Sequence, residues 1–227
     1  YWIVYNGEIY NYKEIKKDLI EKKYKFYSDT DTEVVLNAFR EWGDKAFKKF
    51  NGEWALSILD KVENNIIICR DGIGYKPCYV YEDNNYLAFS SEIKSFSPIK
   101  NLTLNPSNLG VNSSSLQSTC QTVFKHIDIL RHGRILKIDL NNYTKKYYRW
   151  DFPLHNLPKI NPGYKQNVKE LYNLLYESTK LRLNSDVKVG TSLSGGLDSS
   201  AIFTLLNLIE KNEFNKNSHL DLNPTII

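Results

Sequence analysis

The chain has 227 residues, of which 41% are hydrophobic and 25% charged, values that are ordinary for a globular protein able to bury a core. Its formal net charge is only +4, and lysines alternate with acidic residues throughout, so no basic face of the kind that binds nucleic acid is expected. No apolar run approaches the ~20 residues that span a bilayer, and no signal segment stands at the front. These features, with three cysteines that lack disulfide or metal-ligand spacing, predict a cytoplasmic protein without membrane contact.

The first part of the chain alternates strand and helix patterns. An apolar strand is expected over residues 2–5, followed by a turn at Asn6-Gly7-Glu8, because an Asn-Gly pair favours positive φ. A charged helix is expected over residues 12–23, and a second helix after Asp31, with Thr32 as its cap. Four β-rich segments then predict an α+β layout with a largely antiparallel sheet: 53–60, 65–70, 78–81 and 86–90.

The composition shifts near residue 101. Residues 101–121 are rich in Ser, Asn, Leu and Thr and predict an exposed, partly irregular connection. Strand patterns resume at 134–140 and 145–150. Residues 151–163 hold three of the seven prolines, which is typical of a linker between domains.

The last part of the chain begins with an amphipathic helix pattern over residues 167–183, with Val168, Leu171, Leu175 and Leu181 in register. A strand over 187–193, a glycine-rich turn and a helix over 199–211 follow. This order is typical of the start of an α/β nucleotide-binding domain. The expected division is a first domain, a linker and a truncated second domain, at residues 1–150, 151–163 and 164–227.

The strongest chemical signal is the run Ser-Gly-Gly-Leu-Asp-Ser-Ser at residues 194–200. The glycines allow a tight turn that exposes backbone N–H groups, and the following helix presents its positive end to an anion. A plain turn needs no such combination of glycines, aspartate and serines. The run lacks the Gly-Lys-Ser/Thr of a Walker A loop and resembles the pyrophosphate loop of ATP pyrophosphatases, which split ATP into AMP and pyrophosphate. The resemblance implies an Mg²⁺ ligand in Asp198 and these ATP-binding residues: Leu193, Ser194, Gly195, Gly196, Leu197, Asp198 and Ser199.

A second signal is Tyr-Asn-Gly-Glu-Ile-Tyr-Asn at residues 5–11, which by itself is only a tight turn. It resembles the Asn-Gly-Glu-Ile-Tyr-Asn segment of the N-terminal-nucleophile (Ntn) glutamine amidotransferase domain in glutamine-hydrolysing asparagine synthetases. That resemblance implies that Asn6 and Gly7 form the oxyanion hole for glutamine hydrolysis and also bind glutamine, and that Glu8 lines the glutamine pocket.

Three further segments match this family in order. Residues 29–33, Asp-Thr-Asp-Thr-Glu, resemble the stretch whose aspartate grips the glutamine α-amino group; Asp31 fits best and Asp29 is the fallback. Either carboxylate also suits a helix N-terminus. Residues 70–77 and 90–94 resemble segments that we expect to be scaffold, with a share in the domain interface.

The chain departs from the family at its nucleophile, an N-terminal cysteine. It begins with Tyr1, and both ends look like cuts, so the chain as it stands is expected not to hydrolyse glutamine. Cys69 and Cys78 lie in apolar strands and are expected to be buried, and Cys120 is expected to be a bystander.

The resemblance as a whole implies an α+β Ntn-hydrolase-like (αββα sandwich) glutaminase domain, followed by the beginning of an α/β ATP-pyrophosphatase domain. The implied reaction uses Mg-ATP, aspartate and glutamine-derived ammonia, and yields asparagine, AMP and pyrophosphate. A homodimer is compatible with the sequence. Two alternatives stay open: a related amidotransferase for another carboxylate, in a sugar acid or a peptide, and a non-catalytic relative.

Overall fold

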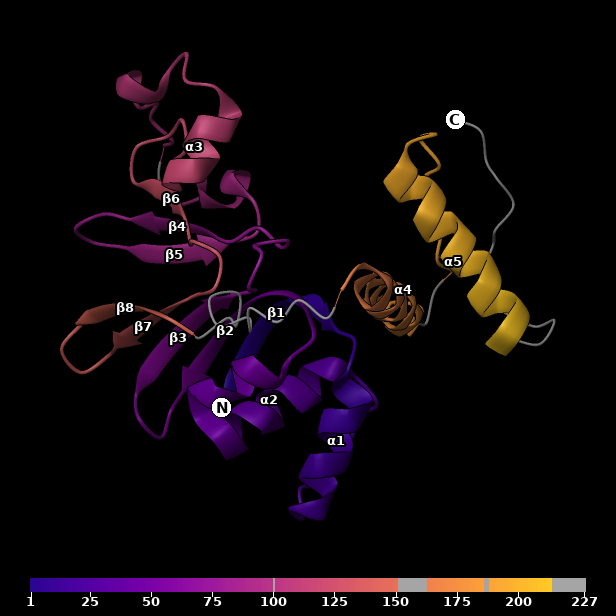
Figure 1. Cartoon of the computed structure of the whole chain (residues 1–227). Coiled ribbons are helices and arrows are strands. Elements are labelled where there is room, and N and C mark those ends of the chain that lie inside the picture. Colours follow the sequence, from indigo (N-terminus) through magenta and orange to yellow (C-terminus); the bar gives the residue numbers. More distant parts are fainter. Residues whose placement is uncertain (100, 151–162, 186–187, 214–227) are drawn as a thin grey trace. The chain divides into compact units, whose positions relative to one another are not determined.

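The computed structural model describes residues 1–99, 101–150, 163–185 and 188–213, which belong to two compact units divided between Asn156 and Leu157 (Figure 1). The predicted linker, apart from Gly163, lies outside the described residues. The domain boundaries placed on either side of it therefore stay a prediction.

The first unit contains two sheets in which all neighbouring strands are antiparallel, as expected (Figure 1). The larger sheet has the order β1 (Trp2–Ile9), β2 (Gly52–Asp60), β3 (Asn65–Arg70), β7 (Arg134–Asp139) and β8 (Lys145–Arg149). The smaller sheet has the order β5 (Leu87–Ser90), β4 (Tyr79–Glu82) and β6 (Ile127–Ile129). The strand β6 was not predicted; it is only three residues long.

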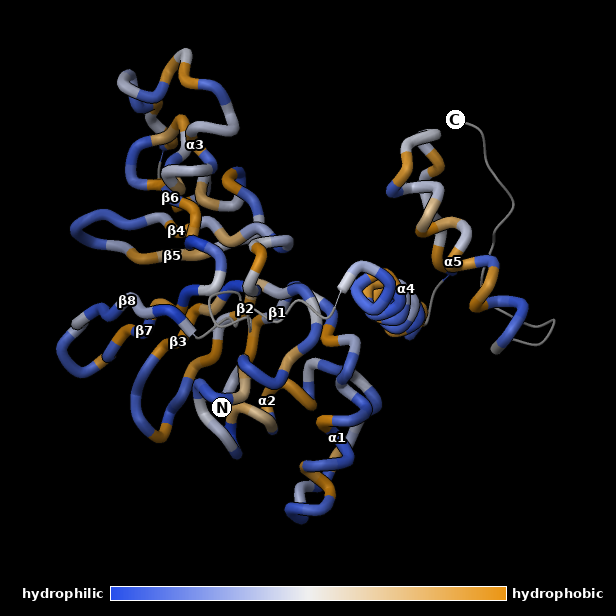
Figure 2. Tube along the Cα trace, in the orientation of Figure 1, coloured by the Kyte–Doolittle hydropathy of each residue, from blue (hydrophilic) through white to orange (hydrophobic). Residues whose placement is uncertain are grey.

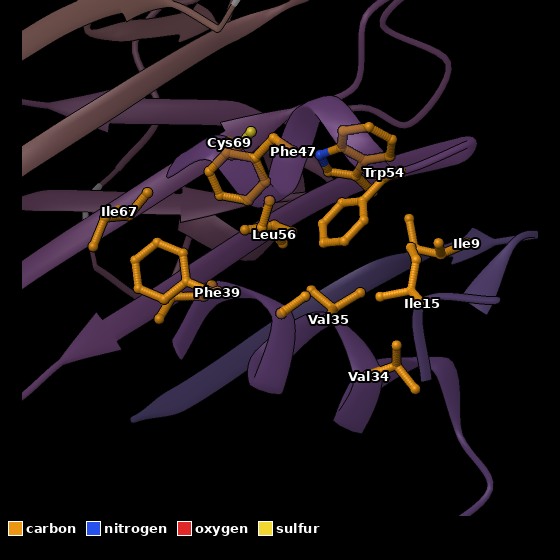
Figure 3. Packing of buried hydrophobic residues seen from close by; sticks show 14 of the residues in the cluster. Ile9, Ile15, Val34, Val35, Phe39, Phe47, Trp54, Leu56, Ile67 and Cys69 are labelled. Carbon is orange, nitrogen blue, oxygen red and sulfur yellow. The ribbon is translucent and has the colours of Figure 1, made fainter. Parts of the chain in front are cut away.

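Helices cover one face of the larger sheet. These are α1 (Tyr12–Glu21), α2 (Asp31–Trp42) and the 3₁₀ helix η1 (Gly43–Lys49). Hydrophobic and hydrophilic positions alternate along α1 (Figure 2), as an amphipathic helix requires. The helices pack against apolar side chains of β1, β2 and β3. Figure 3 labels these residues of the core: Ile9, Ile15, Val34, Val35, Phe39, Phe47, Trp54, Leu56, Ile67 and Cys69.

The smaller sheet covers the opposite face of the larger one. Five consecutive residues of β2, 54–58, are buried, so the strand is covered on both faces rather than alternating between core and solvent. One cluster joins Ala55 and Ile68 of the larger sheet to Val80 of the smaller sheet and to Cys78, which directly precedes β4. On the outer side of the smaller sheet, Phe96 of the 3₁₀ helix η2 (Ile93–Phe96) packs beside Tyr81 and Ile127.

The connection at residues 101–121 is more ordered than expected. It contains the 3₁₀ helix η3 (Pro106–Asn108) and the short helix α3 (Ser113–Thr119). Asparagine side chains cap both: Asn105 accepts a hydrogen bond from the Ser107 N–H, and Asn112 accepts one from the Ser115 N–H. The Asn-rich composition that indicated irregular structure therefore supplies helix N-caps here.

Two local predictions near the N-terminus are wrong. Residues 6–8 form no turn, because β1 continues to Ile9 and pairs with β2 along its whole length. The cap of α2 is Thr30, whose side chain accepts a hydrogen bond from the Glu33 N–H, and not Thr32. The helix thus begins at Asp31.

The second unit contains, among its described residues, the helices α4 (Tyr164–Leu181) and α5 (Leu197–Glu213), which contact each other. Both helices were expected, but their predicted starts, residues 167 and 199, lie three and two residues after the observed starts. The strand predicted over 187–193 is not formed in residues 188–193, where only Val189 makes a bridge; residue 187 lies outside the described residues. A strand needs a hydrogen-bonded neighbour, and no named strand lies in the described part of this unit. Of the predicted apolar stripe on α4, Val168, Leu171 and Leu175 remain exposed.

Candidate functional site

A pocket of about 410 Å³ lies between the two sheets of the first unit. Strands β1 and β2 form one wall, and β5 with the residues that follow it forms another. The residues that line the pocket are Val4, Tyr5, Asn6, Ala55, Leu56, Ser57, Pro77, Cys78, Phe89, Ser90, Ser91, Glu92 and Ser95.

Asn6 reaches across this pocket. Its Nδ2 donates a 2.9 Å hydrogen bond to Oγ of Ser91, a residue 85 positions later in the chain. Strand alternation places Asn6 on the same face as its register partner Ala55, toward the smaller sheet. The amide group has two N–H donors, so one remains for a ligand while the other holds Ser91. The sequence had suggested a scaffold role for residues 90–94, with a share in the domain interface, and no contact with Asn6.

Gly7 is required by a close approach between strands. A Cβ at this position would lie 2.4 Å from the Glu53 carbonyl oxygen and 2.8 Å from the Trp54 Cα. The residue does not have the positive φ that the expected turn would have needed. Gly52, opposite Ile9, is constrained in the same way by the Glu8 carbonyl oxygen.

The outer edge of β1 carries the N–H of Gly7. The Tyr10 N–H points toward β2, where it meets the Asn51 carbonyl, whereas the Ile9 N–H points away and meets Asp31. Because N–H directions alternate along a strand, Gly7 shares the direction of Ile9. Among the described residues β1 is the edge strand of its sheet, so this N–H faces away from the ladder.

Asp31 is bonded to β1 twice. Its Oδ2 accepts a hydrogen bond of 2.6 Å from the Tyr5 hydroxyl and one of 3.0 Å from the Ile9 N–H. Burial and the bond to Asp31 raise the pKa of Tyr5 well above its ordinary value, so the hydroxyl keeps its proton. As the first residue of α2, Asp31 also complements the positive end of the helix.

The fallback candidate, Asp29, lies elsewhere. Its fully exposed side chain pairs with Lys16 at 2.9 Å, and that hydrogen bond lowers the pKa of the carboxyl group. Of the predicted residues, Asn6 lines the described pocket, and Glu8 lies one position further along the same face of β1. Gly7, Glu8 and Asp31 are not in the lining of this pocket.

The segment 70–77 is built as scaffold. Asp71 is fully buried and accepts hydrogen bonds from five backbone N–H groups, those of Trp54, Ile73, Gly74, Tyr75 and Lys76. The guanidinium group of Arg70 donates to three carbonyl oxygens, those of Gly74, Lys76 and Leu130. Asp71 and Arg70 thus hold the loop in place, because their charged side chains form hydrogen bonds with its backbone N–H and carbonyl groups.

The three cysteines are free thiols. Cys69 and Cys78 are buried, as expected, and burial raises the pKa of both, to about 11 for Cys78. A nucleophilic cysteine needs the opposite, a lowered pKa. Neither thiol therefore suits catalysis, although Cys78 lines the pocket.

In the second unit, the glycine-rich run leads directly into α5. Gly195 has φ +79°, and among the described residues a Cβ there would meet no atom within 4 Å, so the positive φ and not crowding favours glycine at this position. The Ser194 and Ser199 hydroxyls lie 3.0 Å apart and bracket the turn. The N–H groups of the first helical turn start here, which suits an anionic phosphate group.

Asp198 lies in the first turn of α5. Mg²⁺ is commonly held by one or two carboxylates together with the phosphates of its nucleotide, so a single aspartate fits. The described residues contain no group of three His, Cys, Asp or Glu side chains that could hold a metal ion by themselves.

None of the helices in the described ranges has the length and apolar character of a membrane-spanning segment.

Comparisons with known proteins match two separate parts of the chain to two family models. A glutamine amidotransferase domain model matches residues 1–149, and an asparagine synthase model matches residues 170–218. A putative glutamine-hydrolysing asparagine synthetase of Methanocaldococcus jannaschii is 38% identical over 209 residues, 88% of this chain and 39% of that protein. A glutamine-hydrolysing asparagine synthetase of Bacillus subtilis is 32% identical over 215 residues, 90% of this chain and 32% of that protein. The chain thus spans about a third of the length of these relatives.

The fold also has a counterpart among solved structures. The allosteric regulatory enzyme of purine biosynthesis has a TM-score of 0.50 at 17% identity, over 88% of this chain and 41% of that chain. At this identity the likeness concerns the fold alone. Together with the amidotransferase model, it confirms the predicted α+β, Ntn-hydrolase-like fold class.

Proposed function

The chain belongs to the family of glutamine-hydrolysing asparagine synthetases, and we propose that its first unit binds glutamine while its second unit contributes the start of an ATP site. In the full gene product, ammonia released from glutamine would be joined to the side-chain carboxylate of aspartate. We assign residues 1–150 to the glutaminase domain and residues 164–227 to the start of the synthetase domain.

The Asn6–Ser91 hydrogen bond carries the glutaminase part of this proposal. Attack on the glutamine amide places a negative charge on its oxygen, and fixed donors aimed at that oxygen lower the barrier. Asn6 retains one side-chain N–H for this purpose, and Gly7 adds a backbone N–H at the edge of β1. Two donors from neighbouring residues, one held by a distant serine, are a suitable oxyanion hole.

Glutamine recognition is assigned to Glu8 and Asp31. Asp31 is tied to β1 by two hydrogen bonds next to Asn6, whereas Asp29 is exposed and paired with Lys16, which supports the choice of Asp31. The nucleophile would be the N-terminal cysteine of the family, which is not among these 227 residues. We therefore expect this chain alone to be inactive.

The ATP part of the proposal rests on the turn at Gly195 and the start of α5. Backbone N–H groups and the Ser194 and Ser199 hydroxyls would hold the phosphates, and Asp198 would hold Mg²⁺. The metal supplies charge neutralisation at the phosphates when bound. Adenylation of aspartate would release pyrophosphate, and amide formation would release AMP. A cytoplasmic location and a homodimer remain predictions.

Replacing Asn6 tests the glutaminase assignment. In the full gene product, Asn6→Ala should lower kcat for glutamate release about 10²- to 10³-fold, the usual loss of one oxyanion donor. Asn85→Ala, at an exposed turn, is the matched control and should leave kcat unchanged. A folded Asn6→Ala protein with full glutaminase activity would contradict the assignment.

A further inference from the structure

Two glutamates face each other at the end of β1. In the register of β1 and β2, Glu8 is directly opposite Glu53. Side chains in such a pair extend from Cβ atoms about 4.5–5.5 Å apart, and like charges in this arrangement repel each other. Two facing carboxylates are therefore unfavourable in a sheet unless a positive group lies between them.

Glu53 has one oxygen without a partner. Its Oε1 accepts a hydrogen bond from the Tyr10 hydroxyl, which orients the carboxylate. Its Oε2 is buried and has no hydrogen-bond partner in the part of the chain that the structure describes. A buried carboxylate oxygen requires a donor, so this atom indicates a missing cation or N–H group.

Glu8 and Glu53 lie on the same face of the larger sheet as Asn6 and Ala55, next to the pocket lining but not in it. Side chains two positions apart on a strand share a face, so Glu8 follows Asn6 on β1, and Glu53 follows Ala55 on β2. Asn6 and Ala55 both line the pocket. The same face of β1 and β2 thus carries an amide donor at Asn6 and, one strand repeat of about 6.8 Å beyond the residues that line the pocket, a pair of carboxylates.

This spacing suits an amino acid with a side-chain amide. In glutamine the α-nitrogen and the amide carbon are four bonds apart, roughly 5 Å when extended. A glutamine whose amide oxygen meets Asn6 can therefore bring its α-ammonium group to Glu8 and Glu53. The N–H groups of the ammonium would supply the donor that Glu53 Oε2 requires, and its positive charge would offset the repulsion between the two carboxylates.

We propose that Glu53 is a specificity-determining residue of the glutamine site, which binds the substrate α-ammonium group together with Glu8. The inference rests on the proposed glutaminase function. Glu53 approaches the ammonium group from the β2 side, whereas Asp31 lies at the outer edge of β1. Glu53 thus selects glutamine over amides that lack an α-amino group.

The test compares glutamine with glutaramate, which is glutamine without its α-amino group, in the full gene product. Glu53→Gln, a neutral variant of the same shape, should raise KM for glutamine at least 10-fold and change kcat less than 3-fold. The KM for glutaramate should stay the same, so the preference for glutamine falls by the same factor. Glu63→Gln, on an exposed turn, is the matched control and should change neither substrate's constants.

A second variant, Tyr10→Phe, tests the same role of Glu53 if the Glu53→Gln protein does not fold. Tyr10→Phe removes the hydroxyl that orients Glu53 and keeps the carboxylate, so it should raise the glutamine KM about 3-fold and leave the glutaramate KM unchanged. If the wild-type protein hydrolyses glutamine and both folded variants keep its preference over glutaramate, the role of Glu53 is wrong. If the wild-type protein does not hydrolyse glutamine, the proposed function itself fails.

Discussion

The Tyr5 hydroxyl donates a 2.6 Å hydrogen bond to Oδ2 of Asp31, which joins β1 to the first residue of α2. The same oxygen accepts the Ile9 N–H, so one carboxylate atom fixes both ends of the segment that contains Asn6, Gly7 and Glu8. The raised pKa of Tyr5 keeps the hydroxyl a donor at neutral pH. The position of the proposed oxyanion hole therefore depends on a contact with the helical layer.

Tyr5→Phe removes this contact and keeps the ring. We expect a loss of about 1.5–3 kcal/mol in the free energy of unfolding, the range for hydrogen bonds to charged groups, together with a higher KM for glutamine. Urea unfolding of this chain and glutaminase kinetics of the full gene product measure the two effects. Tyr27→Phe is the control, because that side chain is 92% exposed and should change stability by less than about 0.5 kcal/mol. Equal stability of the two variants would show that the Tyr5–Asp31 bond does not stabilise the fold.

Gly7→Ala should separate β1 from β2, since the new Cβ would lie 2.4 Å from the Glu53 carbonyl oxygen. Backbone atoms cannot move aside cheaply, so we expect a loss of more than about 2 kcal/mol in the free energy of unfolding. Gly190→Ala, where a Cβ meets no atom within 4 Å, should be close to neutral. The comparison uses denaturant midpoints, and a Gly7→Ala protein as stable as wild type would be inconsistent with the observed strand spacing.

Asp71→Asn replaces one acceptor oxygen of a fully buried carboxylate with an N–H donor that faces backbone N–H groups. We expect a loss of about 3 kcal/mol or more, since buried donors lose their charged acceptor. Asp139→Asn is the matched control, because Asp139 accepts the Asn141 N–H at a more exposed site. Thermal unfolding monitored by circular dichroism should show a much larger fall in Tm for Asp71→Asn. Equal shifts would contradict the scaffold role.

Iodoacetamide should label the three thiols unequally. At pH 8 we expect rapid labelling of Cys120, which is partly exposed, and none of Cys69 and Cys78 in the folded protein, measured by peptide mass spectrometry. Burial raises the pKa of Cys78 to about 11, so between its ordinary pKa and about 11 the unfolded thiol ionises before the folded one. This group therefore favours folding below that window and lowers stability as the pH rises through it. Rapid labelling of Cys78 at pH 8 would contradict its burial.

Several elements could be predicted because their signals are local. The helices near residues 12–23 and 167–183 follow from apolar periodicity, and the strands of the larger sheet follow from short β-branched runs between turn residues. The predicted burial of Cys69 and Cys78 was confirmed for the same reason, since each lies in an apolar strand context.

Other features depend on partners that are distant in sequence. An Asn-Gly pair indicates a turn locally, but pairing with β2 keeps this part of β1 extended. The close approach of Glu53 and Trp54 in β2 explains the glycine. The Ser91 contact with Asn6 spans 85 positions, and a lone serine gives no signal of it. The cap at Thr30 was missed because Thr30 and Thr32 are equally suitable by residue type. The orphan oxygen of Glu53 likewise emerges only from packing.

In the proposed reaction, the full gene product transfers the amide nitrogen of glutamine to aspartate and converts ATP to AMP and pyrophosphate. The most direct test incubates the full gene product with Mg-ATP, aspartate and glutamine labelled with ¹⁵N in its side-chain amide, and follows the products by mass spectrometry. We predict asparagine with ¹⁵N in its amide, together with equal amounts of AMP and pyrophosphate, and loss of all three with Asp198→Ala. A folded wild-type protein that leaves ATP uncleaved in the presence of aspartate, or that forms no labelled asparagine, would contradict the proposed reaction.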